Sequence, residues 1–210
     1  PAPRKGRRSL HTRDDEGRIT TLRLKEVKLA PGDFAIIGRM QHLERLDISQ
    51  TNVSDGDLEQ LASLGRLVRL NLFGTEIDGS GLQHLTSLDK LERLNIGDTK
   101  LTEEALPHLA KLTSLRHLCL CRNLIDDDGL EQMTPLKDLE TLKLGETKVT
   151  DASVSTLVTF SELRSLTLNK TGVTEAGLRE AAKSSRLAWI ASPRATLDEF
   201  VRRMTSGDLA

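Results

Sequence analysis

Hydrophobic residues recur at a fixed interval of 24 residues along most of this chain. Cut every 24 residues from Gly17, the sequence gives eight segments without a gap, and we number the positions of each segment 1 to 24. Positions 3 and 6 are aliphatic in all eight segments. Position 8 is aliphatic in the first seven, and Ser192 takes its place in the eighth. Such self-similarity is the signature of a repeat architecture.

Each segment divides into a strand-like half and a helix-like half. The aliphatic residues at positions 6 and 8 alternate with polar ones, which predicts a short strand. Apolar residues at positions 18, 21 and 24 form one buried stripe of a short helix. Position 14 carries a residue suited to cap that helix, and an acid often follows, where the helix dipole favours it. The capping residues are Ser54, Asp78, Thr102, Asp126, Thr150 and Thr174. In the fourth segment, Pro107 predicts a helix that starts late or is only a turn.

The frame L-x-x-L-x-L, followed by a polar residue at position 11, resembles the leucine-rich repeat family over residues 17 to about 208. That family usually has Asn or Cys at position 11, whereas this chain mostly has Thr. The departure looks like a Thr variant of bacterial repeats, related to the cysteine-containing, ribonuclease-inhibitor-like subclass. A hydroxyl can both donate and accept, so a column of Thr could satisfy backbone groups at the bend as Asn does. The residues are Thr51, Thr75, Thr99, Asn123, Thr147 and Thr171.

The resemblance implies an α/β solenoid, a curved horseshoe with a parallel β-sheet on its concave face and short helices on its convex face. We expect one domain, 17–208, preceded by a basic flexible tail or linker, 1–16. The repeats are 17–40, 41–64, 65–88, 89–112, 113–136, 137–160, 161–184 and a degenerate cap, 185–208. Apolar residues at helical spacing near the end predict an amphipathic capping helix or, alternatively, a helix that docks onto a partner domain. They are Leu197, Phe200, Val201 and Met204.

Charge is unevenly distributed. The net charge is −1, but residues 1–13 carry five basic residues and no acid, which leaves 25 basic against 31 acidic residues in the rest. An acidic body is a poor general nucleic-acid binder, because duplex affinity comes largely from neutralising phosphates. No stretch approaches the roughly 18 apolar residues that a membrane helix needs, and no apolar secretory segment is visible. Two cysteines mildly favour a reducing compartment. We expect a cytoplasmic protein, although a segment ahead of Pro1 would change that expectation.

Function is expected in the positions that the repeat leaves free. In the family, positions 4, 5, 7, 9 and 10 face the concave side. Position 5 stacks arginines and a histidine, and position 4 alternates in sign from Glu92 to Arg164. Two interpretations stay open: the charges neutralise one another, with Glu44 and Glu92 beside the arginines, or they bind an acidic partner. The candidate partner-binding residues are Arg45, Arg69, Phe73, Arg93, Arg116, His117, Arg122, Lys143 and Trp189, the last of which could instead shield the final rung.

Candidate chemistry is sparse. Cys119 and Cys121, with His117 on the same strand, offer three potential metal ligands, but a zinc site normally wants four, so free thiols are the expected state. Residues 74–79 have the G-x-x-x-x-G spacing of a phosphate loop without the Lys and Ser/Thr that must follow. We therefore predict no catalytic residues, no metal and no cofactor.

The sequence predicts a monomeric, non-enzymatic scaffold that binds a protein or peptide, possibly an acidic one, along its concave sheet. One alternative is a sensor or adaptor domain of a larger protein whose effector domain lies outside these residues. Another is a nucleic-acid or ribonuclease-type partner bound through the stacked arginines. The acidic excess of the body argues against nucleic acid.

Overall fold

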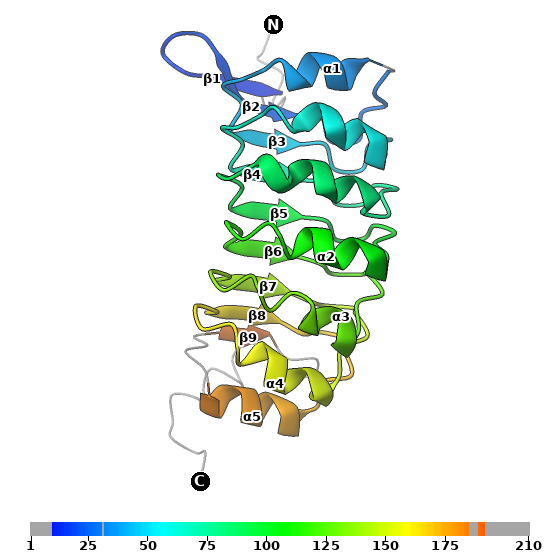
Figure 1. Ribbon diagram of the computed structural model, residues 1–210, viewed down its shortest axis with the longest axis vertical. Helices are drawn as coiled ribbons and strands as arrows, with labels where there is room; N and C mark the ends of the chain where they lie inside the picture. The colour runs from blue at the N-terminus through cyan, green and yellow to red at the C-terminus, as the bar shows by residue number, and fades with distance from the viewer. Residues whose placement is uncertain (1–9, 31, 185–188, 192–210) are drawn as a thin grey trace, which may run out of the picture.

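The protein is a stack of rungs in which each of the first seven 24-residue repeats contributes one strand and a short helical stretch (Figure 1). The computed structural model describes residues 10–30, 32–184 and 189–191. The strands form one sheet in chain order, and the α/β solenoid predicted from the sequence is confirmed. The strands are β1 His11–Arg13, β2 Ile19–Arg23, β3 Arg45–Asp47, β4 Arg69–Asn71, β5 Arg93–Asn95, β6 His117–Cys119, β7 Thr141–Lys143, β8 Ser165–Thr167 and β9 Trp189–Ala191.

Strands β2 to β9 are parallel, and their register follows the repeat without a shift. Leu46 lies opposite Leu70, and Leu70 lies opposite Leu94. The same alignment places Arg45 beside Arg69 and Arg93 beside His117. Residues that share a position in the sequence repeat therefore form a column across the sheet, with neighbours about 4.8 Å apart.

The helical halves are short, and several of them are wholly or partly 3₁₀-helical. A 3₁₀-helix rises about 2.0 Å per residue against 1.5 Å for an α-helix, so it crosses a rung with fewer residues. In the fourth repeat, the helical stretch begins at position 15 with η3, so it does not start late; Pro107 sits in the first turn of α2, which follows directly. The segments are α1 Asp33–Gly38, η1 Asp55–Leu61, η2 Ser80–Ser87, η3 Glu103–Ala105, α2 Leu106–Leu109, α3 Asp127–Glu131, η4 Asp151–Ser153, α4 Val154–Leu157 and α5 Glu175–Ser184.

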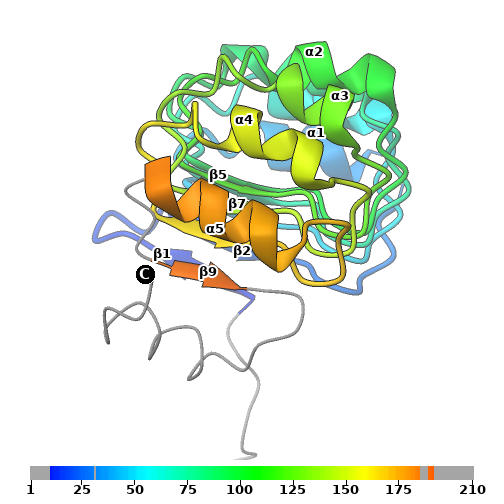
Figure 2. The same ribbon diagram turned by 90° about the horizontal axis from the view of Figure 1, so that it is seen from below.

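An aliphatic core fills the space between the sheet and the helical layer, which Figure 2 shows from one end. The position-6 leucines lie at its centre, and Leu70, Leu94 and Leu118 are at most 2% exposed. Truncating such a residue to Ala typically costs about 2–5 kcal/mol of stability. Within the described ranges, every helix is too short or too polar to cross a bilayer.

The position-11 side chains secure the bend after each strand. Thr51 Oγ1 donates to the carbonyl of Ile48 at 2.7 Å, and Thr75, Thr99, Thr147 and Thr171 make the equivalent bond three residues back. Asn123 donates from Nδ2 to the carbonyls of both Ile96 and Leu120. Since a buried carbonyl needs a donor, this column satisfies backbone that the strands leave unpaired.

Position 10 adopts the left-handed backbone conformation in seven successive repeats, with φ between 54° and 67°. Only one of these residues is glycine, although positive φ is uncommon for other residue types. The conformation continues the ladder beyond the strand: the position-10 N–H donates to the position-9 carbonyl of the next repeat, as in Asp98 to Cys121 at 2.8 Å. The residues are Glu26, Gln50, Gly74, Asp98, Arg122, Glu146 and Lys170.

Acids at position 15 connect neighbouring helical segments. Asp55 accepts hydrogen bonds from the N–H groups of Asp78, Gly79 and Gly81, at 2.9, 3.0 and 2.9 Å. Asp127 accepts from the backbone and hydroxyl of Thr150 in the same manner, and Asp151 from those of Thr174. The sequence assigned these acids to the start of their own helix, whereas their carboxylates also satisfy the first N–H groups of the next segment.

The predicted tail, residues 1–16, differs from the structure over its last residues. His11–Arg13 form β1, which pairs antiparallel with β2 and extends the sheet by one strand. Asp14 stabilises the connecting turn by accepting from the backbone of Arg18 at 2.9 Å, and Gly17 takes a positive φ there. The ordered solenoid therefore begins before Gly17. Residues 1–9 and the predicted capping helix after Ala191 lie outside the described residues.

Candidate functional site

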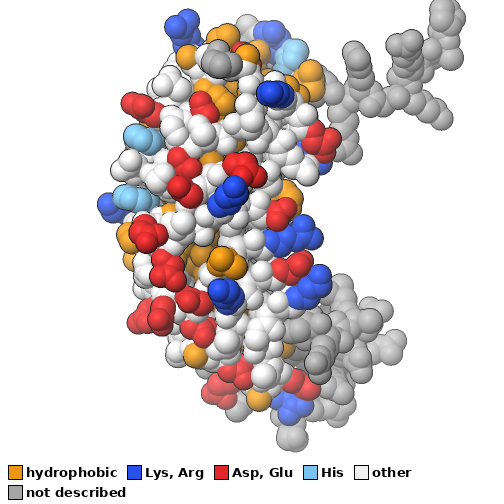
Figure 3. All heavy atoms as spheres, turned by 90° about the vertical axis from the view of Figure 1, so that its right-hand side faces the viewer, with side chains coloured by type: hydrophobic (Ala, Val, Ile, Leu, Met, Phe, Trp, Pro, Cys, Tyr) orange, Lys and Arg blue, Asp and Glu red, His pale blue; other side chains and the backbone are white. Residues whose placement is uncertain are grey.

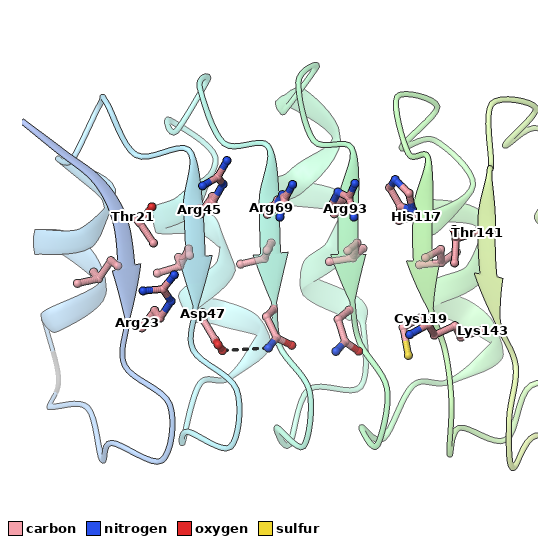
Figure 4. Close-up of a pocket in the computed structure, with 17 residues that line it drawn as sticks. Thr21, Arg23, Arg45, Asp47, Arg69, Arg93, His117, Cys119, Thr141 and Lys143 are labelled. Atoms are coloured by element: carbon pink, nitrogen blue, oxygen red, sulfur yellow. Dashed lines mark hydrogen bonds between the residues drawn. The ribbon is translucent and has the colours of Figure 1, made fainter. Parts of the chain in front are cut away.

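The open face of the sheet carries a shallow groove of about 550 Å³ that runs across β2 to β7 (Figure 4). Side chains at positions 5 and 7 line its two sides, and the buried position-6 leucines lie between them. Of the predicted binding residues, the groove contains Arg45, Arg69, Arg93, His117 and Lys143.

Position 5 forms what we call the arginine column, Arg45, Arg69 and Arg93. The three side chains lie on adjacent strands, at one-strand spacing. Among the described residues, no acidic side chain makes an ion pair with any of them. One of the two interpretations left open by the sequence was that Glu44 and Glu92 neutralise these arginines. In the structure neither acid makes an ion pair with Arg45, Arg69 or Arg93.

Repulsion within the arginine column outweighs the nearby negative charge. Burial, followed by the charges of Arg93 and Arg45, lowers the pKa of Arg69, and the opposite effect of Glu92 is smaller. Arg93 also has an unsatisfied hydrogen-bond donor, because its Nε is buried and makes no hydrogen bond. A buried donor without an acceptor costs free energy that a bound carboxylate or phosphate would recover.

His117 continues the arginine column without continuing its charge. Burial lowers the pKa of His117, and the neighbouring charge of Arg93 lowers it further. The lowered pKa favours the uncharged imidazole over the charged form. Beyond it, Thr141 takes the same position on β7, so the charged run ends at Arg93.

Position 7 forms a polar column along the other side of the groove. Asn71 donates from Nδ2 to Asp47 Oδ1 at 3.0 Å, the bond drawn in Figure 4. The side-chain oxygens of Asn71 and Asn95 accept from the backbone N–H groups of Phe73 and Gly97. These contacts fix the strand ends and leave amide groups facing the groove. Lys143 lies at the far end of the column and is exposed.

The two cysteines lie at positions 7 and 9 of the fifth repeat as free thiols. A hydrogen bond from Cys121 lowers the pKa of Cys119 to about 6, against the effect of burial, and Lys143 assists. The same contact and burial raise the pKa of Cys121. Throughout the part of the chain described, no three His, Cys, Asp or Glu side chains are grouped to hold a metal. His117 therefore does not join the thiols as a third ligand.

Arg116 and Arg122 are paired with acids, unlike the arginine column. Arg116 contacts Glu140 at 2.8 Å, the pairing that sign alternation at position 4 predicts. At position 10 an ion-pair column runs across four repeats. Figure 3 shows Lys and Arg side chains interspersed with Asp and Glu side chains on the side of the molecule that faces the viewer. Arg122 lies 3.8 Å from Asp98 and 3.3 Å from Glu146, and Lys170 lies 3.3 Å from Glu146. These two arginines are less available to a partner.

The remaining predicted residues are differently placed. Phe73 is half-buried and lies over the next repeat, where a Cβ built on Gly97 would come within 3.2 Å of its ring. It is therefore partly used in packing. Trp189 begins β9, in register with Ser165, but its side chain lies outside the described residues.

Sequence reasoning missed the ion-pair column as a unit. The signal was present, because Asp98, Arg122, Glu146 and Lys170 alternate in sign at one repeat position. What the sequence did not show is the left-handed backbone that places these four side chains in one line at the rim.

Solved structures of three leucine-rich repeat proteins resemble this chain. Internalin C2 of Listeria monocytogenes has a TM-score of 0.62 and 22% identity, with 81% of this chain and 70% of that chain covered. The internalin InlF of the same species has a TM-score of 0.52 and 19% identity, with 83% and 61% covered.

The third structure comes from a plant. The ectodomain of the Arabidopsis thaliana receptor kinase GASSHO1/SCHENGEN3, in complex with CASPARIAN STRIP INTEGRITY FACTOR 2, has a TM-score of 0.54 and 20% identity. The match covers 86% of this chain and 25% of that ectodomain. The sequence matches no protein-family model and none of the curated proteins. At these identities the likeness establishes the fold.

Proposed function

Because this chain has the leucine-rich repeat fold, we propose that it is a non-enzymatic scaffold that binds a protein or peptide on its concave sheet. The observation that carries the proposal is the arginine column, Arg45, Arg69 and Arg93, which faces the groove and makes no ion pair with an acid in the described part of the chain. The partner is acidic where it meets this column.

The size and chemistry of the surface support this function. Eight rungs at about 4.8 Å give a face roughly 40 Å long, enough for a standard interface of about 800 Å² per partner. Arginine is enriched among the residues that dominate interface energies. Arg69 and Arg93 lie on β4 and β5, in the middle of the groove that runs from β2 to β7, and neither makes an ion pair with a described acid.

The comparisons are consistent with recognition. The Arabidopsis ectodomain is described in complex with a second factor, so one protein of this fold binds another molecule. Thr at position 11 supports the bacterial, ribonuclease-inhibitor-like subclass as the closer relation. We further propose that the chain acts as a monomer in the cytoplasm and needs no cofactor. Because it spans only 61% and 25% of two of the matched chains, a role as the recognition part of a larger protein is the second candidate.

The test is affinity purification from a lysate of the organism that makes the protein. The variant Arg69→Gln/Arg93→Gln is compared with the wild type and with Arg39→Gln/Lys111→Gln, which removes the same charge from exposed residues outside the groove. We expect the wild type and the control to retain one partner that the groove variant loses. Retention by all three, with unchanged circular dichroism, would show that the arginine column is not the binding surface.

A further inference from the structure

We propose that the partner presents an acidic α-helix that lies across β3 to β5 along the axis of the solenoid. Its acids occupy positions i, i+3 and i+7, one opposite each member of the arginine column. This inference rests on the proposed function and deepens it, because it specifies the shape of the acidic partner as well as its charge.

The spacing of the column favours a helix. Arg45, Arg69 and Arg93 lie on successive strands, so their Cα atoms are at about 0, 4.8 and 9.6 Å along the axis. Residues i, i+3 and i+7 of an α-helix lie at about 0, 4.5 and 10.5 Å along its own axis. The mismatch is about 1 Å at most, which the arginine side chains accommodate.

Other backbones fit the column less well. An extended peptide presents one face every second residue, at about 6.6–6.8 Å, so its third acid would lie at about 13 Å, roughly 4 Å beyond the last arginine. A helix also keeps residues i, i+3 and i+7 on one face, so all three carboxylates point to the sheet together. The repeat length thus distinguishes a helical acidic partner from an extended one.

The width and the ends of the groove agree with a helix of limited length. The amide column of Asn71 and Asn95 runs parallel to the arginines, two residues further along each strand, or about 6.6 Å away. An α-helix about 10 Å in diameter covers both columns. Thr21 on β2 and the imidazole of His117 on β6 bound the charged run, so three acids saturate it.

A hydrogen bond between a partner carboxylate and the unsatisfied donor of Arg93 would contribute to the affinity. Arg93 lines the groove that the helix would cover, and its Nε is buried without a hydrogen bond, so a modest turn of the guanidinium would bring this donor to a ligand. A carboxylate there would accept a charge-assisted hydrogen bond, roughly twice as strong as a neutral one. It would also relieve the repulsion that Arg93 and Arg45 exert on Arg69.

The experiment uses three fluorescein-labelled peptides of identical length and net charge and the full chain. The first is a helix-forming peptide with Glu at i, i+3 and i+7, and the second has the same composition with Glu at i, i+2 and i+5. The third keeps the first pattern but carries two prolines that prevent a helix. Fluorescence anisotropy at low salt should show the first peptide binding about tenfold tighter than either of the others.

The protein variants locate the site. Arg69→Gln/Arg93→Gln should lose the preference for the first peptide, and Arg39→Gln/Lys111→Gln should keep it. Equal affinity for the first two peptides, tighter binding of the proline peptide, or no binding of any peptide would overturn the helix model. If the groove variant still loses its partner in the lysate, such a result would leave the proposed function standing. A helix preference that survives the groove variant would place the helix site elsewhere.

Discussion

The arginine column and the ion-pair column are built in the same way but have opposite electrostatic effects. Both stack charged side chains at one repeat position across adjacent rungs. In the ion-pair column the signs alternate, so Arg122 and Lys170 lie 3.3 Å from Glu146. In the arginine column the signs are the same, and burial followed by the neighbouring charges of Arg93 and Arg45 lowers the pKa of Arg69. A repeat protein can neutralise a column at no cost in geometry, so a column left unneutralised indicates a surface suited to an external partner.

The largest expected effect comes from loosening β5, which carries Arg93 and leads into Asp98, and so serves both columns. Leu94 is 2% exposed beneath it. We expect Leu94→Ala to lower the free energy of unfolding by about 2–5 kcal/mol, measured by urea denaturation. The matched control is Leu124→Ala, since Leu124 is 70% exposed and its truncation should change stability by less than about 0.5 kcal/mol. Similar losses in both variants would contradict the assigned core.

Removing a carboxylate that accepts hydrogen bonds from the backbone of the next repeat should lower stability more than removing an exposed carboxylate. Asp55 accepts from three N–H groups of the next repeat. Asp55→Ala leaves those donors without their acceptor, and we expect a loss of about 1–3 kcal/mol in urea denaturation. The exposed Asp89, for which Asp89→Ala is the control, should give a much smaller change. A loss from Asp55→Ala no larger than that of the control would refute the inter-repeat role.

The two columns should respond to the loss of an arginine with opposite signs. Arg122→Ala removes a cation between Asp98 and Glu146 and should destabilise the fold by about 0.5 kcal/mol. Arg69→Ala removes a cation between two others and should stabilise the fold by a similar amount, about 0.5 kcal/mol. Both changes should shrink as NaCl is added, because salt screens exposed charges. Changes of the same sign in the two variants would undo the comparison.

Lowering the pH should weaken the stabilisation from the ion-pair column, which contains carboxylates, and should leave the arginine column unchanged. Hydrogen bonds from Arg122 and Lys170 lower the pKa of Glu146 below its usual value. The stabilisation from Glu146 is therefore present above the unfolded pKa, about 4.3, and is lost as pH falls through the folded value. We expect Glu146→Gln to flatten slightly the decline of the thermal midpoint between about pH 5 and pH 3. Superimposable profiles of wild type and variant would show that Glu146 contributes nothing.

The repeat made most of the fold predictable. With one leucine or isoleucine per rung at position 6 and no gap between segments, the register of β2 to β9 follows from the sequence alone. The strand β1 was not predictable in this way, because its residues precede the first repeat and carry no aliphatic alternation. His11–Arg13 pair with β2 through backbone bonds and a turn stabilised by Asp14, which periodicity does not register.

The sequence predicted which side chains lie on the open face of the sheet better than it predicted which of their charges are paired. Position 5 was correctly placed in the groove, because alternation along a strand fixes which side chains share a face. Whether a charge is paired depends on distances of a few ångströms. Arg116 reaches Glu140, whereas Arg69 reaches neither Glu44 nor Glu92 within ion-pair distance. The left-handed position 10 was not visible either, since only Gly74 there carries the usual signal.

The carboxylates that span neighbouring repeats also give the molecule a direction of assembly. Asp55, Asp127 and Asp151 each cap the helical segment that comes after their own, so the acceptor always precedes its donors in the chain. Chains are synthesised from the N-terminus, and N-terminal parts fold first. A ribosome therefore delivers each of these three acceptors before the segment that needs it, and each of these three rungs presents a ready acceptor to the next.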